Sequence, residues 1–214
     1  MSGNQVNVYD RFVDFLAGHQ AAVDLLERAQ DHKSPIEFVV LAASVIDAFL
    51  REALVYEHQI KTQSMAIPES LVYQQPRSSG ISERGIYMKA RDARVISPEL
   101  FKRLSDLYDD RSAVVHRYII TAITTERVLE IAAQYEEILE AVQAARDEVS
   151  TRLMNAGCGT VVEFPEDLEM VDAAALDVDI EEPKLGTVED KHGSSWVKKY
   201  LGKEDVDKPP SSKP

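Results

Sequence analysis

Cysteine is nearly absent from this chain of 214 residues, in which Cys158 stands alone. One thiol cannot form an internal disulfide or supply a cysteine-rich metal site. The histidines His19, His32, His58 and His192 show no paired spacing with carboxylates that would recommend a metal site. We therefore expect no metal, no cofactor and a cytoplasmic location.

Long apolar runs and an excess of positive charge are also missing. No apolar stretch approaches the 18 or so residues that a membrane span requires, so we expect a soluble protein without a membrane partner. A net charge of −13 argues against a protein that coats nucleic acid by bulk electrostatics. Residues 77–117 nevertheless hold nine basic and six acidic residues, which concentrates positive charge in one part of the chain.

Apolar residues recur at helical spacing through most of the first 156 residues. This spacing predicts helices over 6–30, 35–59, 82–95, 97–111 and 125–154, with a loop over 64–80. Hydroxyl side chains stand at the expected N-caps, which are Ser34, Ser82, Ser97 and either Thr124 or Thr125. Residues 39–50 are apolar nearly all round, as expected of a central helix covered on several sides. The sequence predicts an all-α bundle of four to five helices.

The composition changes after residue 156, which divides the chain into a bundle (1–156) and a tail (157–214). The tail holds fourteen acidic and seven basic residues with many prolines, glycines and serines, a composition that predicts disorder. Two interpretations remain open. The tail either solubilises the protein, or imitates nucleic acid and masks the basic region.

Residues 109–118 contain an arginine, a histidine and a tyrosine in the pattern Arg111-x4-His116-x-Tyr118. An arginine can clamp a phosphate through its planar fork of donors, and a histidine can exchange a proton near neutral pH. A phosphate-binding cation and a proton-transfer group are the minimum needed to cut RNA without a metal. We predict Arg111 and His116 as catalytic residues, with Tyr118 and Ser112 binding substrate or carrying a modification.

A structural interpretation of the same residues stays open. Arg111 can instead pair with one of the acids Asp106, Asp109 and Asp110 on a solvated helix face. His116 is then an interface histidine, and Tyr118 packs with its hydroxyl at the rim.

Two carboxylates are candidates for a supporting role near the motif. Asp110 directly precedes Arg111, and Asp47 is the one charge inside the apolar run of the second helix. Burying a carboxylate is costly unless a cation or a set of donors receives it. Arg51, four residues after Asp47, can also satisfy that carboxylate as an ordinary pair within the helix.

The spacing of the motif restricts its geometry. Residues five apart on a regular α-helix are separated by about 140° around the axis. We therefore expect a helix start or a kink between Arg111 and His116. RNA cleavage needs a base, an acid and donors to the phosphate, whereas one motif offers one histidine and one arginine. A homodimer with a composite site supplies two of each.

The apolar second helix (residues 41–54) and an Arg-x4-His motif leading into a long last helix resemble the HEPN superfamily over residues 5–156. Tyr118 extends this resemblance to the HepT toxin branch, while Ser112 stands where the family often has asparagine. The resemblance implies an all-helical, usually dimeric bundle that often acts as a metal-independent endoribonuclease. It also implies a nucleotidyltransferase antitoxin as partner, which attaches AMP to the tyrosine that matches Tyr118.

The sequence therefore predicts a toxin or defence-associated endoribonuclease that acts on RNA as a homodimer. The alternative is a catalytically inactive HEPN-like dimer that serves as an interaction or regulatory module. Under that alternative Arg111 and His116 have structural roles.

Overall fold

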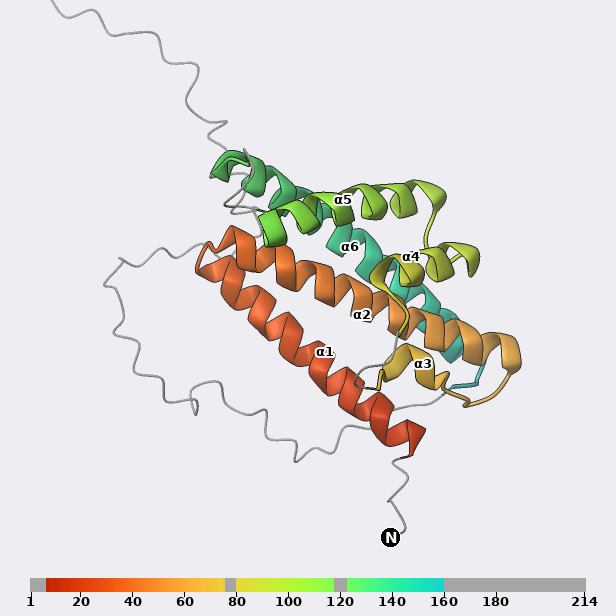
Figure 1. The fold of residues 1–214 in the computed structure, drawn as a ribbon. Coiled ribbons are helices and arrows are strands. Elements are labelled where there is room, and N and C mark those ends of the chain that lie inside the picture. Colours follow the sequence, from red (N-terminus) through yellow and green to blue (C-terminus); the bar gives the residue numbers. More distant parts are fainter. Residues whose placement is uncertain (1–6, 76–79, 118–122, 160–214) are drawn as a thin grey trace, which may run out of the picture.

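The computed structural model describes residues 7–75, 80–117 and 123–159, except for the side chains of His116 and Arg117. Every regular element in these ranges is a helix, so the predicted all-α bundle is confirmed (Figure 1). The helices are α1 (Val8–Asp31), α2 (Pro35–Thr62), α3 (Glu69–Val72), α4 (Glu83–Asp92), α5 (Pro98–Arg117) and α6 (Thr125–Asn155). None of them is long and apolar enough to cross a membrane. Most of the predicted tail lies outside the described residues.

The bundle has six helices in its described part, one more than the predicted four to five. The additional helix is α3, a single turn inside the segment predicted as a loop. Arg51 on α2 holds this segment, because its guanidinium donates to the carbonyl oxygens of Leu71 (3.0 Å) and Ile81 (3.1 Å). A long-range contact thus orders residues that show no helical pattern of their own.

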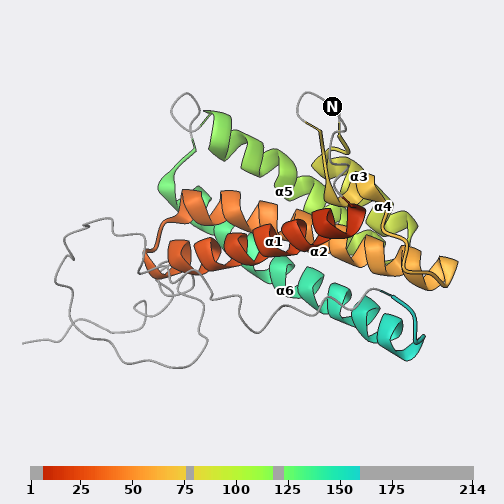
Figure 2. The same ribbon diagram turned by 90° about the horizontal axis from the view of Figure 1, so that it is seen from below.

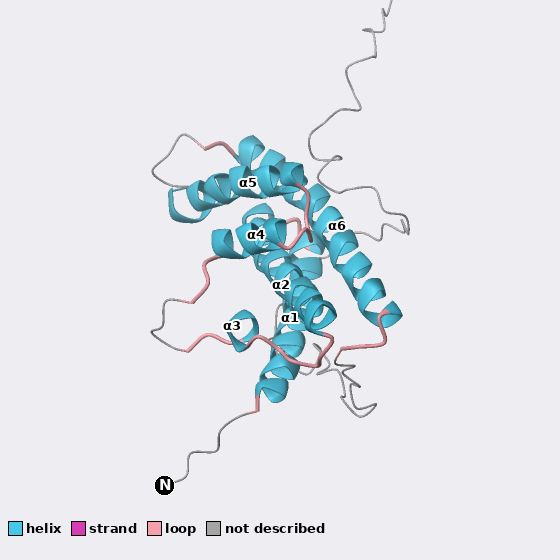
Figure 3. Ribbon diagram, turned by 90° about the vertical axis from the view of Figure 1, so that its right-hand side faces the viewer, coloured by secondary structure: helices cyan, strands magenta, loops and turns pink. Residues whose placement is uncertain are grey.

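Helix α2 is the centre of the bundle. It contacts each of the other five helices, and α1 folds back against it through a short turn at residues 32–34 (Figures 1 and 2). Helix α4 lies between α2 and α5, as Figure 3 shows. Fully or almost fully buried apolar side chains of α2 are Phe38, Val39, Ala42, Val45, Ile46, Leu50, Ala53 and Val55. The larger of these each contribute about 1.5–3 kcal/mol by leaving water.

Three of the predicted caps are confirmed by hydrogen bonds to the first turn of a helix. Ser82 accepts from the Gly85 amide (3.2 Å), Ser97 from Leu100 (3.1 Å) and Thr124 from Arg127 (3.2 Å). Ser34 occupies the predicted N-cap position of α2, although its side chain makes no cap hydrogen bond. At this start Pro35 occupies the first turn, where its fixed φ suits a helix.

Candidate functional site

The predicted catalytic motif lies in the last turns of α5. This helix is continuous from Pro98 to Arg117, so the expected helix start or kink between Arg111 and His116 is wrong. Leu104, Leu107 and Val114 form its buried stripe and keep the segment helical. Arg111 falls on the same stripe, four residues after Leu107 and three before Val114. The side chain of His116 and the whole of Tyr118 lie outside the described part of the chain.

Arg111 is bound by α4. Its guanidinium forms an ion pair with the carboxylate of Glu83, and both side chains are about one-fifth exposed. It also lies 5.2 Å from the centre of the Tyr108 ring, whereas its Nε is buried without a hydrogen-bond partner. Two of the three acids expected as partners of Arg111 pair with other arginines: Asp109 with Arg84 on α4 at 2.6 Å, and Asp110 with Arg127.

Asp110, predicted to support the motif, joins α5 to α6. Its carboxylate pairs with Arg127 at 2.9 Å, and Arg127 also binds Glu130 at 2.9 Å. This pair fastens the motif-bearing end of α5 to the first turn of α6. Ser112, one residue after Arg111, is half-buried.

Asp47 lies near Arg111, but its direct ion-pair partner is Arg51. The Asp47 Oδ2 atom accepts a hydrogen bond from Arg51 Nε at 2.5 Å, while Oδ1 is buried without a hydrogen-bond partner. Burial raises the pKa of Asp47, and the charges of Arg51 and Arg111 partly offset that rise. The structure therefore brings Asp47 close enough for Arg111 to act on its charge.

We name these side chains the Arg111 cluster. Its members are Asp47 and Arg51 on α2, Glu83 and Tyr87 on α4, Tyr108 and Arg111 on α5, and Tyr135 on α6. Burial alone lowers the pKa of Arg111, but the charge of Glu83 raises it above its ordinary value, so the guanidinium stays charged. Burial, with Glu83 beside it, raises the pKa of Tyr87, whose hydroxyl donates to Glu83 at 2.5 Å. The guanidinium of Arg111 is thus an oriented cation whose counter-ion, Glu83, also accepts a hydrogen bond from the neutral hydroxyl of Tyr87.

A second polar network, which the sequence reasoning missed, crosses the bundle near the middle of α2. Glu52 is only 5% exposed and accepts a hydrogen bond from the Tyr56 hydroxyl at 2.6 Å. His19 from α1 approaches it at 3.6 Å and Arg146 from α6 at 3.6 Å. Burial raises the pKa of Glu52. Its hydrogen bonds to His19 and Tyr56 and the charge of Arg146 lower the pKa by more than burial raises it, so the pKa lies below its ordinary value. The sequence signal that could have revealed this network is the place of Glu52 among the apolar residues Leu50, Ala53 and Leu54.

Neither network holds a metal site, because no described group of three or more histidine, cysteine, aspartate or glutamate side chains is arranged to hold an ion. Comparison of the chain with protein-family models, with curated proteins and with solved structures gives no match.

The Glu83–Arg111 pair is expected to be energetically coupled. Replacing Glu83 with alanine leaves a largely buried guanidinium without its counter-ion and should lower the free energy of unfolding by about 2 kcal/mol. The double variant Glu83→Ala/Arg111→Ala should lose at least about 1 kcal/mol less than the two single variants together, measured by urea denaturation. The exposed pair Arg84 and Asp109 is the matched control, with an expected coupling of about 0.5 kcal/mol or less. Equal coupling in the two pairs would contradict the buried role of Glu83.

Glu52 should make stability depend on pH. A lowered pKa means that its contribution is complete above the ordinary value of 4.5 and is lost as the pH falls through the lowered value. Glu52→Gln should therefore be less stable than the wild type at pH 7 by about 2 kcal/mol, because Arg146 loses its buried carboxylate partner and keeps only the exposed Asp147. This difference should shrink on acidification in urea unfolding curves. Glu37→Gln, an exposed change on the same helix, should differ from the wild type in the free energy of unfolding by an amount that does not shrink on acidification.

Proposed function

We propose that this protein is a metal-independent endoribonuclease of the HEPN type, acting in the cytoplasm as a homodimer. The observation that supports the proposal is the position of Arg111. It lies on the same helix as His116, and Glu83 on α4 orients its charged guanidinium. A fixed cation and a group that exchanges protons near neutral pH suit phosphodiester chemistry when both are brought to one cleft.

The proposed reaction is a transesterification. The ribose 2′-oxygen forms a bond to the adjacent phosphorus while the bond from phosphorus to the 5′-oxygen breaks. One imidazole takes the 2′-hydroxyl proton, a second group gives a proton to the leaving 5′-oxygen, and Arg111 stabilises the charge on the phosphate. The products carry a 2′,3′-cyclic phosphate and a free 5′-hydroxyl.

The continuous helix α5 is the reason for proposing a dimer. Positions 111 and 116 are about 140° apart around one regular helix, so a single protomer does not present them on the same face. A two-fold axis close to the end of α5 would bring a second arginine and a second histidine to the same cleft. In this arrangement Tyr118 follows the catalytic histidine, and an AMP group attached there by a nucleotidyltransferase partner would add negative charge and block RNA.

The ion pair with Glu83 also favours a second candidate function. A guanidinium already neutralised by a carboxylate and mostly buried is typical of a structural arginine. Under this candidate the protein is a catalytically silent, dimeric interaction or regulatory module. Glu83 then only stabilises the fold, and Arg111 binds no phosphate.

Cleavage of RNA in EDTA distinguishes the two candidates. We expect the wild type to cut single-stranded or structured RNA and to leave 2′,3′-cyclic phosphate ends. His116→Ala should lower the rate by at least about 100-fold, because a positioned proton-transfer group contributes that much. The measurement is the initial rate, with product ends identified by mass spectrometry, for proteins matched in oligomeric state.

His32→Ala is the control, because it removes an exposed histidine at the turn between α1 and α2. It should leave the rate unchanged. An intact, unmodified dimer that cuts no RNA would contradict the nuclease proposal and favour the interaction module. Activity that survives His116→Ala would exclude the proposed site.

A further inference from the structure

An open groove lies at the far end of α2 from the turn at residues 32–34. Its main part has a volume of about 430 Å³ between α2, α3 and α4, and a second hollow of about 390 Å³ continues it toward the end of α6. Glu57, Lys61, Asp92 and Ala93 line both parts. We call this surface the basic groove.

The basic groove has more positive than negative side chains. Lys61, Lys89, Arg94 and Arg152 line it, against the two carboxylates Glu57 and Asp92. Both carboxylates are already engaged: Glu57, only 6% exposed, binds Lys61 at 3.3 Å and Arg152 at 3.0 Å, and Asp92 binds Arg91 at 2.8 Å.

Lys89 and Arg94 are exposed and have no ion-pair partner among the described residues. Most other arginines of the basic segment 77–117 that the structure describes are paired with carboxylates, among them Arg84, Arg103 and Arg111. Uncompensated positive charge therefore gathers in this groove of an acidic protein.

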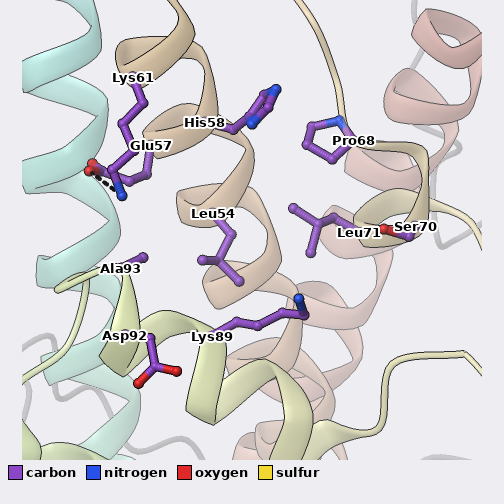
Figure 4. Close-up of a pocket in the computed structure, with 10 residues that line it drawn as sticks. All are labelled: Leu54, Glu57, His58, Lys61, Pro68, Ser70, Leu71, Lys89, Asp92 and Ala93. Carbon is purple, nitrogen blue, oxygen red and sulfur yellow. Dashed lines mark ion pairs between the residues drawn. The ribbon is translucent and has the colours of Figure 1, made fainter.

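The floor of the basic groove is apolar. Leu54, Leu71 and Ala93 lie there, and Figure 4 shows Lys89 extending from α4 toward the space between the two leucines. On the opposite side Lys61 is held beside Glu57 (Figure 4). A segment that fits this surface carries acids at its edges and apolar side chains between them.

The end of α6 and the residues up to Cys158 lie beside this groove. Arg152 is a groove residue, and the Cys158 thiol lies 3.8 Å from the carbonyl oxygen of Gln59, two residues before Lys61. The end of α6 accordingly lies beside the end of α2 (Figure 1). The sequence that follows has the required pattern, because residues 153–183 hold nine acids and no lysine or arginine. Within them, residues 163–172 place Phe164, Leu168, Met170 and Val171 among five acids.

We propose that residues 163–172 dock in the basic groove of their own chain. Residue 163 is four residues beyond Gly159 and residue 172 is thirteen, so they reach up to about 13 Å and about 43 Å from that point. Because the segment is attached at Gly159, its effective concentration at the groove is in the millimolar range. A free anion of the same chemistry lacks this advantage. The acids Glu163, Glu166 and Asp167 meet the lysines and arginines, and the apolar residues cover the floor. This docking does not depend on the nuclease activity proposed above.

Zero-length crosslinking of the full chain with a carbodiimide tests this docking, because it joins a carboxylate to a lysine amine only when the two touch. We expect Lys61 and Lys89 to crosslink to residues 163–172 at least fivefold more than Lys33 and Lys102, two exposed lysines that do not line the groove. The yields are measured by mass spectrometry on a mixture of unlabelled and ¹⁵N-labelled protein. Crosslinks within one chain carry a single isotope.

A charge reversal in the groove provides a matched pair of variants. Lys89→Glu should lower the crosslinking of Lys61 to residues 163–172 severalfold, whereas Lys102→Glu should leave it unchanged. Equal yields at all four lysines, or crosslinks that join two different chains, would overturn the proposal. It would also be overturned if the tail fails to crosslink there while Lys89→Glu weakens binding of a fluorescent oligoribonucleotide in EDTA at least tenfold, since the groove would then bind RNA.

Discussion

The bundle depends on keeping three buried or half-buried carboxylates of α2 neutralised. Asp47, Glu52 and Glu57 follow one another at intervals of five residues, so each points about 140° away from the one before it. Cations come to them from different parts of the chain: Arg51 and Arg111 act on Asp47, Arg146 on Glu52, and Lys61 and Arg152 on Glu57. Removing one partner of such a pair leaves an uncompensated charge in the interior, which costs about 3–5 kcal/mol when the site is fully buried. The neighbouring helices are thereby fixed in register on α2.

This constraint connects the fold to the proposed activity. Arg51 neutralises Asp47 and also binds the carbonyl groups of Leu71 and Ile81, which places the segment that leads into α4. Helix α4 then supplies Glu83, the counter-ion that orients Arg111 on α5. At the other end of α2, Glu57 holds Lys61 and Arg152 at the wall of the basic groove. The candidate catalytic arginine and the groove are therefore both organised from α2.

Local patterns in the sequence predicted the helices and their starts, because caps and apolar spacing act within a few residues. They identified α2 as central and the four N-cap positions correctly, although Ser34 makes no side-chain cap hydrogen bond. They did not reveal that Glu83 binds Arg111, because these residues are 28 positions apart and only the packing of α4 on α5 brings them together. For the same reason α3 and the network around Glu52 could not be predicted: their stability comes from contacts with distant segments. The unbroken helix through Arg111 reflects the buried stripe of α5, which the expectation of a kink had neglected.

The proposed composite site requires two copies of the chain. A single protomer carries Arg111 and position 116 about 140° apart on one helix, which leaves the proton-transfer group and the cation on different faces. The most direct measurement is the molar mass of the purified full chain by light scattering coupled to size-exclusion chromatography at micromolar concentration. The account predicts a dimer of about twice 23.9 kDa. A protein that cuts RNA as a monomer of 23.9 kDa would contradict it.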